Sequence, residues 1–298
     1  MTATSPAWDL SLRSPDDDSP AVVWAVGDAA DGGPAGRRVA RRIRGARCDR
    51  LLYLGDVYET GTAEEFSRHY DPLFGPLAPV TAPTPGNHEW GNRADGYEAY
   101  WTAARGAPPP PWYAFELGGW EVLALNSEEP CGPNSPQGRW LRSRLEHEVE
   151  GRLAFWHRPR FSAGTHGDQP DVAPLWDALR GRASIVLGGH EHNLQRMQPT
   201  DGLTQFVVGA GGRGHYALAR SWRWPRRRRP GDQPFRDRRL AWANDTDDGA
   251  LRLELSPGLA RCAFVAADGR ILDAGAITGH GAAAAPSRPR RRLALVSR

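Results

Sequence analysis

The sequence contains no lysine, only three cysteines and no long apolar run. The cysteines, Cys48, Cys131 and Cys262, lie far apart without paired spacing, which argues against a disulfide framework and against a thiolate zinc site. No window reaches the roughly 20 apolar residues that a membrane-spanning helix requires, and the N-terminus lacks the basic-then-apolar layout of a signal peptide. We therefore expect a cytoplasmic protein that does not enter the membrane, in which any metal chemistry uses His, Asp and Asn.

All 38 basic residues are arginine, and the formal net charge is only +3. The arginines gather at residues 226–229, 236–239 and 288–292. Such clusters can bind nucleic acid or another anionic surface, but a basic run flanked by proline is more typical of a solvated loop or tail.

An apolar content of 40% and twelve tryptophans in 298 residues are ample for a buried core, in one large α/β domain or two small ones. Residues 1–19 are polar and proline-rich, which predicts a disordered segment. Residues 20–278 are predicted to form the folded domain, with an Arg- and Trp-rich inserted loop at about residues 218–248. Residues 279–298 are predicted to be a basic, flexible tail.

A repeated pattern of an apolar run followed by glycine and aspartate begins the domain. Residues 22–26 form the first run, which stops at Gly27-Asp28, and residues 51–54 form the second, which stops at Gly55-Asp56. Val39 and Ile43 lie four residues apart between these runs, as on the buried stripe of a crossover helix. The pattern predicts a βαβ unit with two parallel strands.

Further elements follow from local signals. Thr62 and Glu65 form a capping-box pattern that predicts a helix through about Tyr70, and a second helix is expected at residues 95–104. Gly118-Gly119 between two apolar runs predicts a tight hairpin of residues 112–117 and 120–125. Two more helices are predicted by apolar faces, Trp140, Leu141, Leu145 and Val149 in one and Leu175, Trp176 and Leu179 in the other. Short strands are expected at residues 251–255, 260–265 and 271–276.

Metal-capable side chains follow several of the predicted strands. Residues 153–156 end at His157, residues 185–187 end at Gly188-Gly189-His190-Glu191-His192, and residues 205–208 end in a glycine-rich stretch. Ligands of α/β sheets bind beyond the carboxyl ends of the strands. We therefore expect these side chains to converge on one rim of the molecule.

Asn87 and His88 follow Gly86, after the short apolar run of residues 80–83. An Asn oxygen is a neutral, hard ligand for a divalent metal, and a neighbouring His that points elsewhere can bind phosphate or donate a proton. Taken alone, the stretch could equally be an ordinary turn. For Asp28 and Asp56 the alternative is a capping role, and for His157 it is a hydrogen-bonded core histidine.

Together these motifs resemble the calcineurin-like metallophosphoesterases, in their order and spacing, over about residues 21–276. The motifs are Gly27-Asp28, Gly55-Asp56, Gly86-Asn87-His88-Glu89, Trp156-His157 and Gly189-His190-Glu191-His192. Ala30 stands where most of the superfamily has His, and Tyr58 follows the second Asp, as in the purple acid phosphatase branch. His166 follows His157, as a second histidine does in that branch. The resemblance implies a four-layer α/β/β/α sandwich of two mixed sheets with flanking helices.

The resemblance also implies a role for each motif residue. Asp56 would bridge two metals, Asp28, His192 and Tyr58 would bind the first, and Asn87, His157 and His190 would bind the second. His88 and His166 would contact phosphate and protonate the leaving group. The branch has its tyrosine three residues after the bridging Asp, whereas Tyr58 is two residues after Asp56 and Glu59 is three. Glu59 could therefore bind in place of Tyr58, or neither could.

The expected activity is hydrolysis of small phosphate esters by attack of a metal-bridging hydroxide, without a covalent enzyme intermediate. Two metals about 3.5–4 Å apart can activate such a nucleophile and bind the phosphoryl oxygens. The ligands suit iron paired with zinc, manganese or a second iron. Two alternatives remain: a nucleotide or nucleic-acid phosphodiesterase, suggested by the arginine clusters, and a non-catalytic binding module that has lost one metal site, suggested by Ala30 and the shifted Tyr58.

Overall fold

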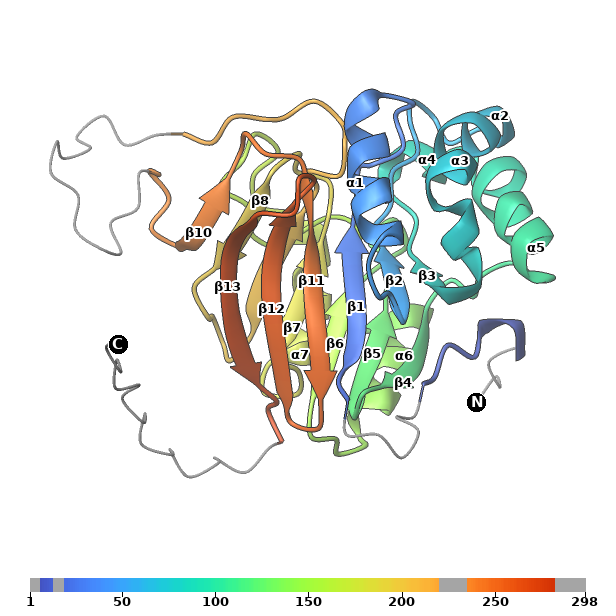
Figure 1. The fold of residues 1–298 in the computed structure, drawn as a ribbon. Coiled ribbons are helices and arrows are strands. Elements are labelled where there is room, and N and C mark those ends of the chain that lie inside the picture. Colours follow the sequence, from blue (N-terminus) through green and yellow to red (C-terminus); the bar gives the residue numbers. More distant parts are fainter. Residues whose placement is uncertain (1–5, 13–18, 220–234, 282–298) are drawn as a thin grey trace, which may run out of the picture.

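Two β-sheets pack face to face and form the centre of the molecule (Figure 1). This computed structural model describes residues 6–12, 19–219 and 235–281. The first sheet has six strands, in the order β13 (Ile271–Thr278), β12 (Leu259–Ala266), β11 (Gly249–Ser256), β1 (Ala21–Val26), β2 (Arg50–Tyr53) and β3 (Thr81–Pro83). The second has seven, in the order β10 (Leu240–Asn244), β8 (Leu194–Met197), β9 (Thr204–Val208), β7 (Ile185–Gly188), β6 (Arg152–Phe155), β5 (Trp120–Ala124) and β4 (Tyr113–Leu117).

Both sheets mix parallel and antiparallel pairs. In the first, β1 pairs in parallel with β2, and β2 with β3, whereas β11, β12 and β13 are antiparallel neighbours. In the second, β5, β6, β7 and β9 are parallel. The predicted βαβ unit is confirmed, because α1 (Pro34–Arg44) connects β1 and β2 and buries Val39 and Ile43.

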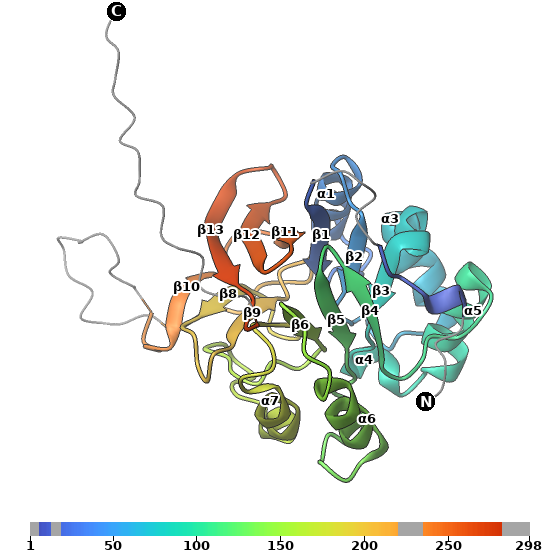
Figure 2. The same ribbon diagram turned by 90° about the horizontal axis from the view of Figure 1, so that it is seen from below.

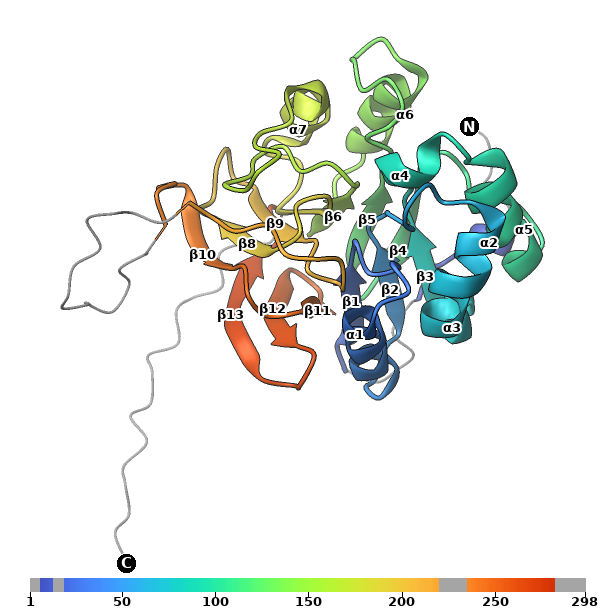
Figure 3. The same ribbon diagram turned by 90° about the horizontal axis from the view of Figure 1, so that it is seen from above.

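Helices lie on the outer side of each sheet, beside β1, β2 and β3 in the first and beside β5, β6 and β7 in the second (Figures 2 and 3). On the second sheet, α6 (Pro136–Leu145) and α7 (Ala173–Leu179) pack apolar residues such as Leu141 and Leu175 against Leu123 and Val186. The first sheet is flanked by α1, α2 (Ala63–Glu65), α3 (Asp71–Phe74) and α5 (Ala99–Arg105), while α4 (Asn87–Trp90) lies beyond the end of β3. Short π and 3₁₀ segments join them, at Phe66–Tyr70, Gly75–Val80, Ala94–Glu98 and Pro170–Val172. The predicted α/β/β/α layering is confirmed.

Local signals in the sequence are confirmed where they were strongest. Thr62 caps α2 and forms the capping box with Glu65, and helical structure continues through Tyr70. Gly118 (φ 57°) and Gly119 (φ 80°) turn the β4–β5 hairpin with the left-handed backbone that glycine permits. The three C-terminal strands form as expected.

The expectation of disorder over residues 1–19 is wrong for residues 6–12. Residues Pro6–Trp8 form a 3₁₀ helix, and the side chains of Trp8 and Leu10 are buried in the main core. Trp8 donates a hydrogen bond to the Ala107 carbonyl. The polar composition of the segment gave no sign that Trp8 and Leu10 are buried. Their burial depends on partners about one hundred residues away in the sequence, such as Ala107 for Trp8.

Other boundaries also differ from the expectation. The C-terminal end of the predicted inserted loop forms β10, which pairs with β8, a strand that the sequence analysis missed. Val149 lies beyond the end of α6, and Gly279 and Gly281 of the predicted tail donate backbone hydrogen bonds to Gly258 and Glu150.

Several parts of the predicted insertion and tail lie outside the described residues. They include the arginines at 226–229 in the insertion and residues 282–298 of the tail, with the arginines at 288–292. Residues 1–5 and 13–18 of the N-terminal segment also lie outside the described residues. Within the described ranges, no helix is long and apolar enough to cross a membrane.

Candidate metal centre

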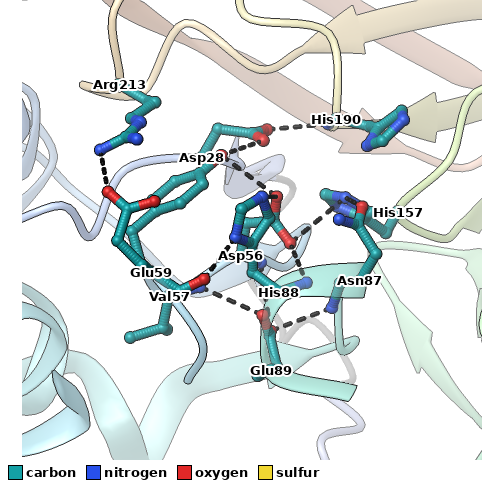
Figure 4. Close-up of polar contacts among 12 residues, drawn as sticks. Asp28, Asp56, Val57, Glu59, Asn87, His88, Glu89, His157, His190 and Arg213 are labelled. Atoms are coloured by element: carbon teal, nitrogen blue, oxygen red, sulfur yellow. Dashed lines mark hydrogen bonds and ion pairs between the residues drawn. The ribbon is translucent and has the colours of Figure 1, made fainter. Parts of the chain in front are cut away.

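The predicted site residues gather at one rim, where the carboxyl ends of strands from both sheets meet (Figure 4). Asp28 and Asp56 follow β1 and β2 of the first sheet, and Asn87 begins α4 after β3. The second sheet contributes the histidines, His157 after β6 and then His190 and His192 after β7. The centre therefore lies at the junction of the two sheets.

Unusual backbone conformations aim these side chains. Asp28, Asp56 and His190 have φ values of 58°, 68° and 67°, in the left-handed region that residues with a side chain rarely adopt. In the described parts of the chain, the one other non-glycine residue with positive φ is Asp201. Such strain persists only where the surrounding structure enforces it, and it concentrates at functional sites.

Glycines let the strand ends come close to one another. A Cβ atom on Gly86 would lie 2.1 Å from Oδ1 of Asp56, and one on Gly55 would lie 2.6 Å from the Gly86 nitrogen and 2.8 Å from Nδ1 of His157. All three distances are far below van der Waals contact. The Gly-Asp and Gly-Asn pairs are therefore steric requirements of the site.

The first group of donor atoms surrounds the Tyr58 hydroxyl. This oxygen lies 2.9 Å from Oδ1 of Asp28, 3.1 Å from Oδ2 of Asp56 and 2.9 Å from Nε2 of His192. The Tyr58 side chain is buried, whereas Glu59 is 60% exposed and pairs with Arg213 at 2.6 Å. Of the two candidates, the tyrosine faces the donor group and the glutamate faces away.

The second group shares Asp56 with the first. Nε2 of His157 lies 3.1 Å from Oδ1 of Asn87 and 3.4 Å from Oδ1 of Asp56. Ligand atoms of Asp56, His157 and His190 all lie within 4.8 Å of one another, and all three residues are buried. One carboxylate thus contributes an oxygen to each group.

Two histidines lie at the rim instead of inside it. The His88 side chain is 31% exposed, and its Nε2 lies 3.8 Å from Oδ2 of Asp56. The His166 side chain is 35% exposed, and its ring centroid lies 4.2 Å from that of His190. Both imidazoles therefore border the donor groups and remain open to solvent, as groups that meet a substrate must be.

Backbone carbonyls orient the buried imidazoles. Nδ1 of His157 lies 2.7 Å from the Leu54 oxygen, and Nδ1 of His192 lies 2.9 Å from the Gly214 oxygen. Because a carbonyl only accepts hydrogen bonds, each Nδ1 must carry the proton. Nε2 of each ring is thereby the nitrogen that faces the donor groups, which is the usual supporting arrangement around a metal-binding histidine.

Burial and neighbouring charges shift the pKa of several groups in the centre. Burial and the charge of Asp56 raise the pKa of Asp28 well above its usual range. Burial also opposes ionisation of Asp56, but His157 outweighs it and lowers the pKa of that carboxyl. Despite its burial, His157 has its pKa raised to about 10 by Asp56, whereas burial lowers the pKa of His190 to about 2 and of His192 to about 4.

Two buried glutamates support the site from behind. Glu89 accepts hydrogen bonds from the backbone nitrogens of Asp56, Val57 and Gly86, and burial and Asp56 raise its pKa to about 7. Glu191 accepts from the segment that carries His166. Both glutamates are part of recognised motifs, but their partners could not be read from the sequence.

Two other residues escaped the sequence analysis altogether. Arg213 stacks its guanidinium 4.6 Å above the Tyr58 ring (Figure 4 shows its pairing with Glu59). Tyr216 stacks on His192 with ring centroids 4.2 Å apart. Both lie in the glycine-rich segment after β9, whose only sequence signal is its position after a predicted strand.

Solved structures share this fold. Purple acid phosphatase PPD1 from yellow lupin (Lupinus luteus) seeds superposes with a TM-score of 0.69 at 15% identity, over 94% of this chain and 58% of the lupin chain. GAP50, the anchor in the inner membrane complex of Plasmodium, superposes with a TM-score of 0.67 at 13% identity, over 87% of this chain and 89% of the GAP50 chain. A dimetal phosphatase from Danio rerio superposes with a TM-score of 0.59 at 12% identity, over 88% of this chain and 99% of the Danio rerio chain.

At these identities the likeness shows the fold alone, and the chain spans little more than half the length of the lupin enzyme. No curated protein matches the sequence. The family model for calcineurin-like phosphoesterases matches residues 12–194, more than half of the chain. This protein therefore belongs to the calcineurin-like phosphoesterase family.

Proposed function

We propose that the protein hydrolyses phosphate esters at a centre that holds two metal ions. The observation that carries the proposal is the pair of buried donor groups that share the Asp56 carboxylate. A structural role for so many buried polar side chains would need a matching set of protein hydrogen-bond donors. Here several of the closest contacts join atoms that bind metals, such as Nε2 of His157 and Oδ1 of Asn87.

The residues present fit a metal pair. Asp28, Tyr58 and His192 would hold one ion, and Asn87, His157 and His190 the other, with Asp56 between them. Carboxylate, phenolate, amide and imidazole donors suit iron, zinc or manganese. The electrostatics favour cations too, because burial and then repulsion from Asp56 raise the pKa of Asp28, and a bound cation would favour its ionised form.

When bound, a metal pair supplies Lewis-acid activation of water and neutralises charge on the phosphoryl oxygens. The side chains of the protein do the rest. His88 would donate a hydrogen bond to a phosphoryl oxygen, and His166 would give a proton to the departing ester oxygen. If the site residues carry about three negative charges against four or five on the metals, the net positive charge favours an anionic ester.

The fold does not by itself decide between enzyme and binding module, since GAP50 is an anchor with the same fold. One arginine of the described cluster is not free to bind nucleic acid. Arg239 in the cluster at 236–239 pairs with Asp168 and Asp237, so its charge is already neutralised. We therefore favour a small phosphate ester as substrate.

The test is hydrolysis of para-nitrophenyl and bis-para-nitrophenyl phosphate by metal-reconstituted protein, together with elemental analysis. We expect about two metals per chain. Asn87→Ala should lower kcat/KM by more than the roughly 10- to 100-fold that loss of a supporting residue costs. Asn134→Ala, at an exposed asparagine in the loop before α6, is the matched control.

Two results would contradict the proposal. Activity that survives both chelation and Asn87→Ala would exclude the metal centre as its source. One metal or none per chain, with no hydrolysis, would instead support the binding module. The ratio of the rates on the two substrates would also show whether monoesters or diesters are preferred.

A further inference from the structure

Glu191 lies between His190 and His192 in sequence, yet its carboxylate faces away from the donor groups. The side chain is fully buried. Its carboxylate accepts hydrogen bonds from Oγ of Ser162 at 3.1 Å and from the backbone nitrogens of Thr165 at 2.8 Å and His166 at 2.9 Å. Oε2 also lies 3.7 Å from Nδ1 of His166. All of these partners belong to one short segment, residues 162–166.

The same segment has a second attachment to the strand that follows Glu191. The backbone nitrogen of Ala163 donates to Oε1 of Gln195 at 2.9 Å, and Nε2 of Gln195 donates to Oγ of Ser162 at 3.1 Å. Gly164 leaves no room for a side chain, because a Cβ there would lie 2.1 Å from Cδ of Glu191. The segment is therefore shaped around the buried carboxylate.

We propose that Glu191 is the positioning residue that holds His166 beside the metal centre as proton donor. This inference rests on the proposed function. When water attacks phosphorus and the bond from phosphorus to the ester oxygen breaks, that oxygen takes a proton from His166, which later regains one from solvent. With Nδ1 of His166 turned toward Glu191, Nε2 is the nitrogen that faces the substrate.

A glutamine could not replace the glutamate in this role. Oε1 accepts from Thr165, and Oε2 accepts from both Ser162 and His166. An amide has one oxygen, so its NH₂ group would face at least one backbone N–H donor. Glu191→Gln keeps the size of the side chain and removes the attachment of the segment, which makes it the informative variant.

The experiment compares two leaving groups in a double-mutant cycle. Protonation matters more for phenyl phosphate than for para-nitrophenyl phosphate, whose leaving group is less basic. Glu191→Gln should lower kcat on phenyl phosphate by roughly 100-fold, at the lower end of general-acid effects, and on para-nitrophenyl phosphate by less, roughly 10-fold. The double variant of Glu191→Gln and His166→Ala should have a kcat no lower than that of His166→Ala alone, because both substitutions act through the His166 imidazole.

Glu89→Gln is the matched control, since Glu89 is equally buried and accepts three backbone hydrogen bonds, but around Asp56. Its effect should be independent of the leaving group and should add to that of His166→Ala. If the effect of Glu191→Gln on kcat is also independent of the leaving group, or if Glu191→Gln lowers the metal content, the positioning role is wrong. Should Glu191→Gln not fold, Ser162→Ala should show the same leaving-group pattern more weakly.

A readout without substrate separates this inference from the proposed function. In Glu191→Gln the amide hydrogens of Thr165 and His166 should exchange at least 10-fold faster, whereas Glu89→Gln should leave them protected. Unchanged exchange in Glu191→Gln would overturn the positioning role whatever the activity. If these amide hydrogens exchange faster in Glu191→Gln but the unsubstituted protein hydrolyses no ester, the attachment of the segment to Glu191 is supported and the proposed function is wrong.

Discussion

At the scale of single residues, several side chains of the centre are held in place by neighbouring groups. Carbonyls hold His157 and His192, Glu89 holds the backbone of Asp56, and Arg213 covers the Tyr58 ring. Such partners keep donors in place before any ligand arrives, which lowers the cost of ordering them on binding. Substitutions of single residues should therefore distinguish the side chains that offer a donor atom from the residues that hold them in place.

Tyr58→Phe removes the hydroxyl that contacts Asp28, Asp56 and His192 and leaves the ring in place. We expect the affinity for the first metal to fall by at least the roughly 10- to 100-fold typical of a lost supporting group. If that metal is ferric iron, the visible charge-transfer colour should disappear. Elemental analysis and the visible spectrum measure both effects.

Tyr113→Phe is the control for Tyr58→Phe, because Tyr113 is also buried and its hydroxyl donates only to the Pro83 carbonyl. It should cost about 1 kcal/mol of stability and leave metal content unchanged. Unaltered metal content and spectrum in Tyr58→Phe would exclude the tyrosine as a ligand.

The buried His192 should make the metal-free protein less stable as the pH falls from about 6.5 to 4. Burial lowers the pKa of His192 to about 4, against about 6.5 in the unfolded chain. In that window the unfolded state binds the additional proton, so His192 costs up to about 3 kcal/mol of folding free energy at the acidic end. His157 does not contribute in this window, because its pKa is raised and its contribution is complete below pH 6.5. Glu89, whose pKa is raised to about 7, acts in the opposite direction, so the contribution of His192 is measured as the difference between the variant and the unsubstituted protein.

Urea unfolding at several pH values, with and without His192→Gln, measures this term. The variant should show a shallower loss of stability between pH 6.5 and 4 than the unsubstituted protein. His147→Gln, at an exposed position, should follow the unsubstituted protein. Identical pH dependence in all three would contradict the assignment.

At the scale of elements, the sequence predicted what depends on neighbours in the chain and missed what depends on distant ones. Asp28 and Asp56 were recognisable because each follows an apolar run and a glycine, and the hairpin at Gly118-Gly119 because its turn chemistry is local. By contrast, β10 is a strand only because it pairs with β8, and Glu191 holds His166 through a segment about 25 residues earlier. Local patterns carry no information about such pairings.

The capping box of α2 gives a prediction at this scale. Oγ1 of Thr62 accepts from the Glu65 nitrogen, and the Glu65 carboxylate accepts from the nitrogens of Thr62, Thr60 and Glu59. Thr62→Ala should lower the free energy of unfolding by about 1 kcal/mol. Thr62→Ser keeps the oxygen and should lose only a few tenths; equal losses in the two variants, measured by urea unfolding, would show that the cap contributes nothing.

At the scale of the whole molecule, the centre exists only while the two sheets stay in register. Asp28, Asp56 and Asn87 come from one sheet and the three histidines from the other. Arg196 of β8 and Asp273 of β13 join the sheets through two hydrogen bonds of 2.7 and 2.9 Å. The Trp120 side chain in β5 donates to the Ser256 carbonyl in β11. Contacts far from the rim thus contribute to its geometry.

The N-terminal segment is another such connection. Leu12 donates a backbone hydrogen bond to Glu116 in β4 of the second sheet, while Trp8 packs edge-on against Trp101 in α5, which flanks the first sheet. Arg105 stacks over the Trp8 ring at 4.5 Å and donates to the Ala7 carbonyl. The segment therefore holds a helix beside one sheet to the edge strand of the other.

Trp8→Ala should destabilise the protein by about 3–5 kcal/mol, because it empties a fully buried site and leaves the Ala107 carbonyl without its donor. Ile271→Ala, at a side chain that is 68% exposed, should change stability by less than about 0.5 kcal/mol. Urea unfolding of the metal-free variants measures both. A loss below about 1 kcal/mol for Trp8→Ala would mean that residues 6–12 do not hold the two layers together. If Trp8→Ala loses the expected 3–5 kcal/mol, metal binding should restore part of its stability, because the proposed ligands come from both sheets.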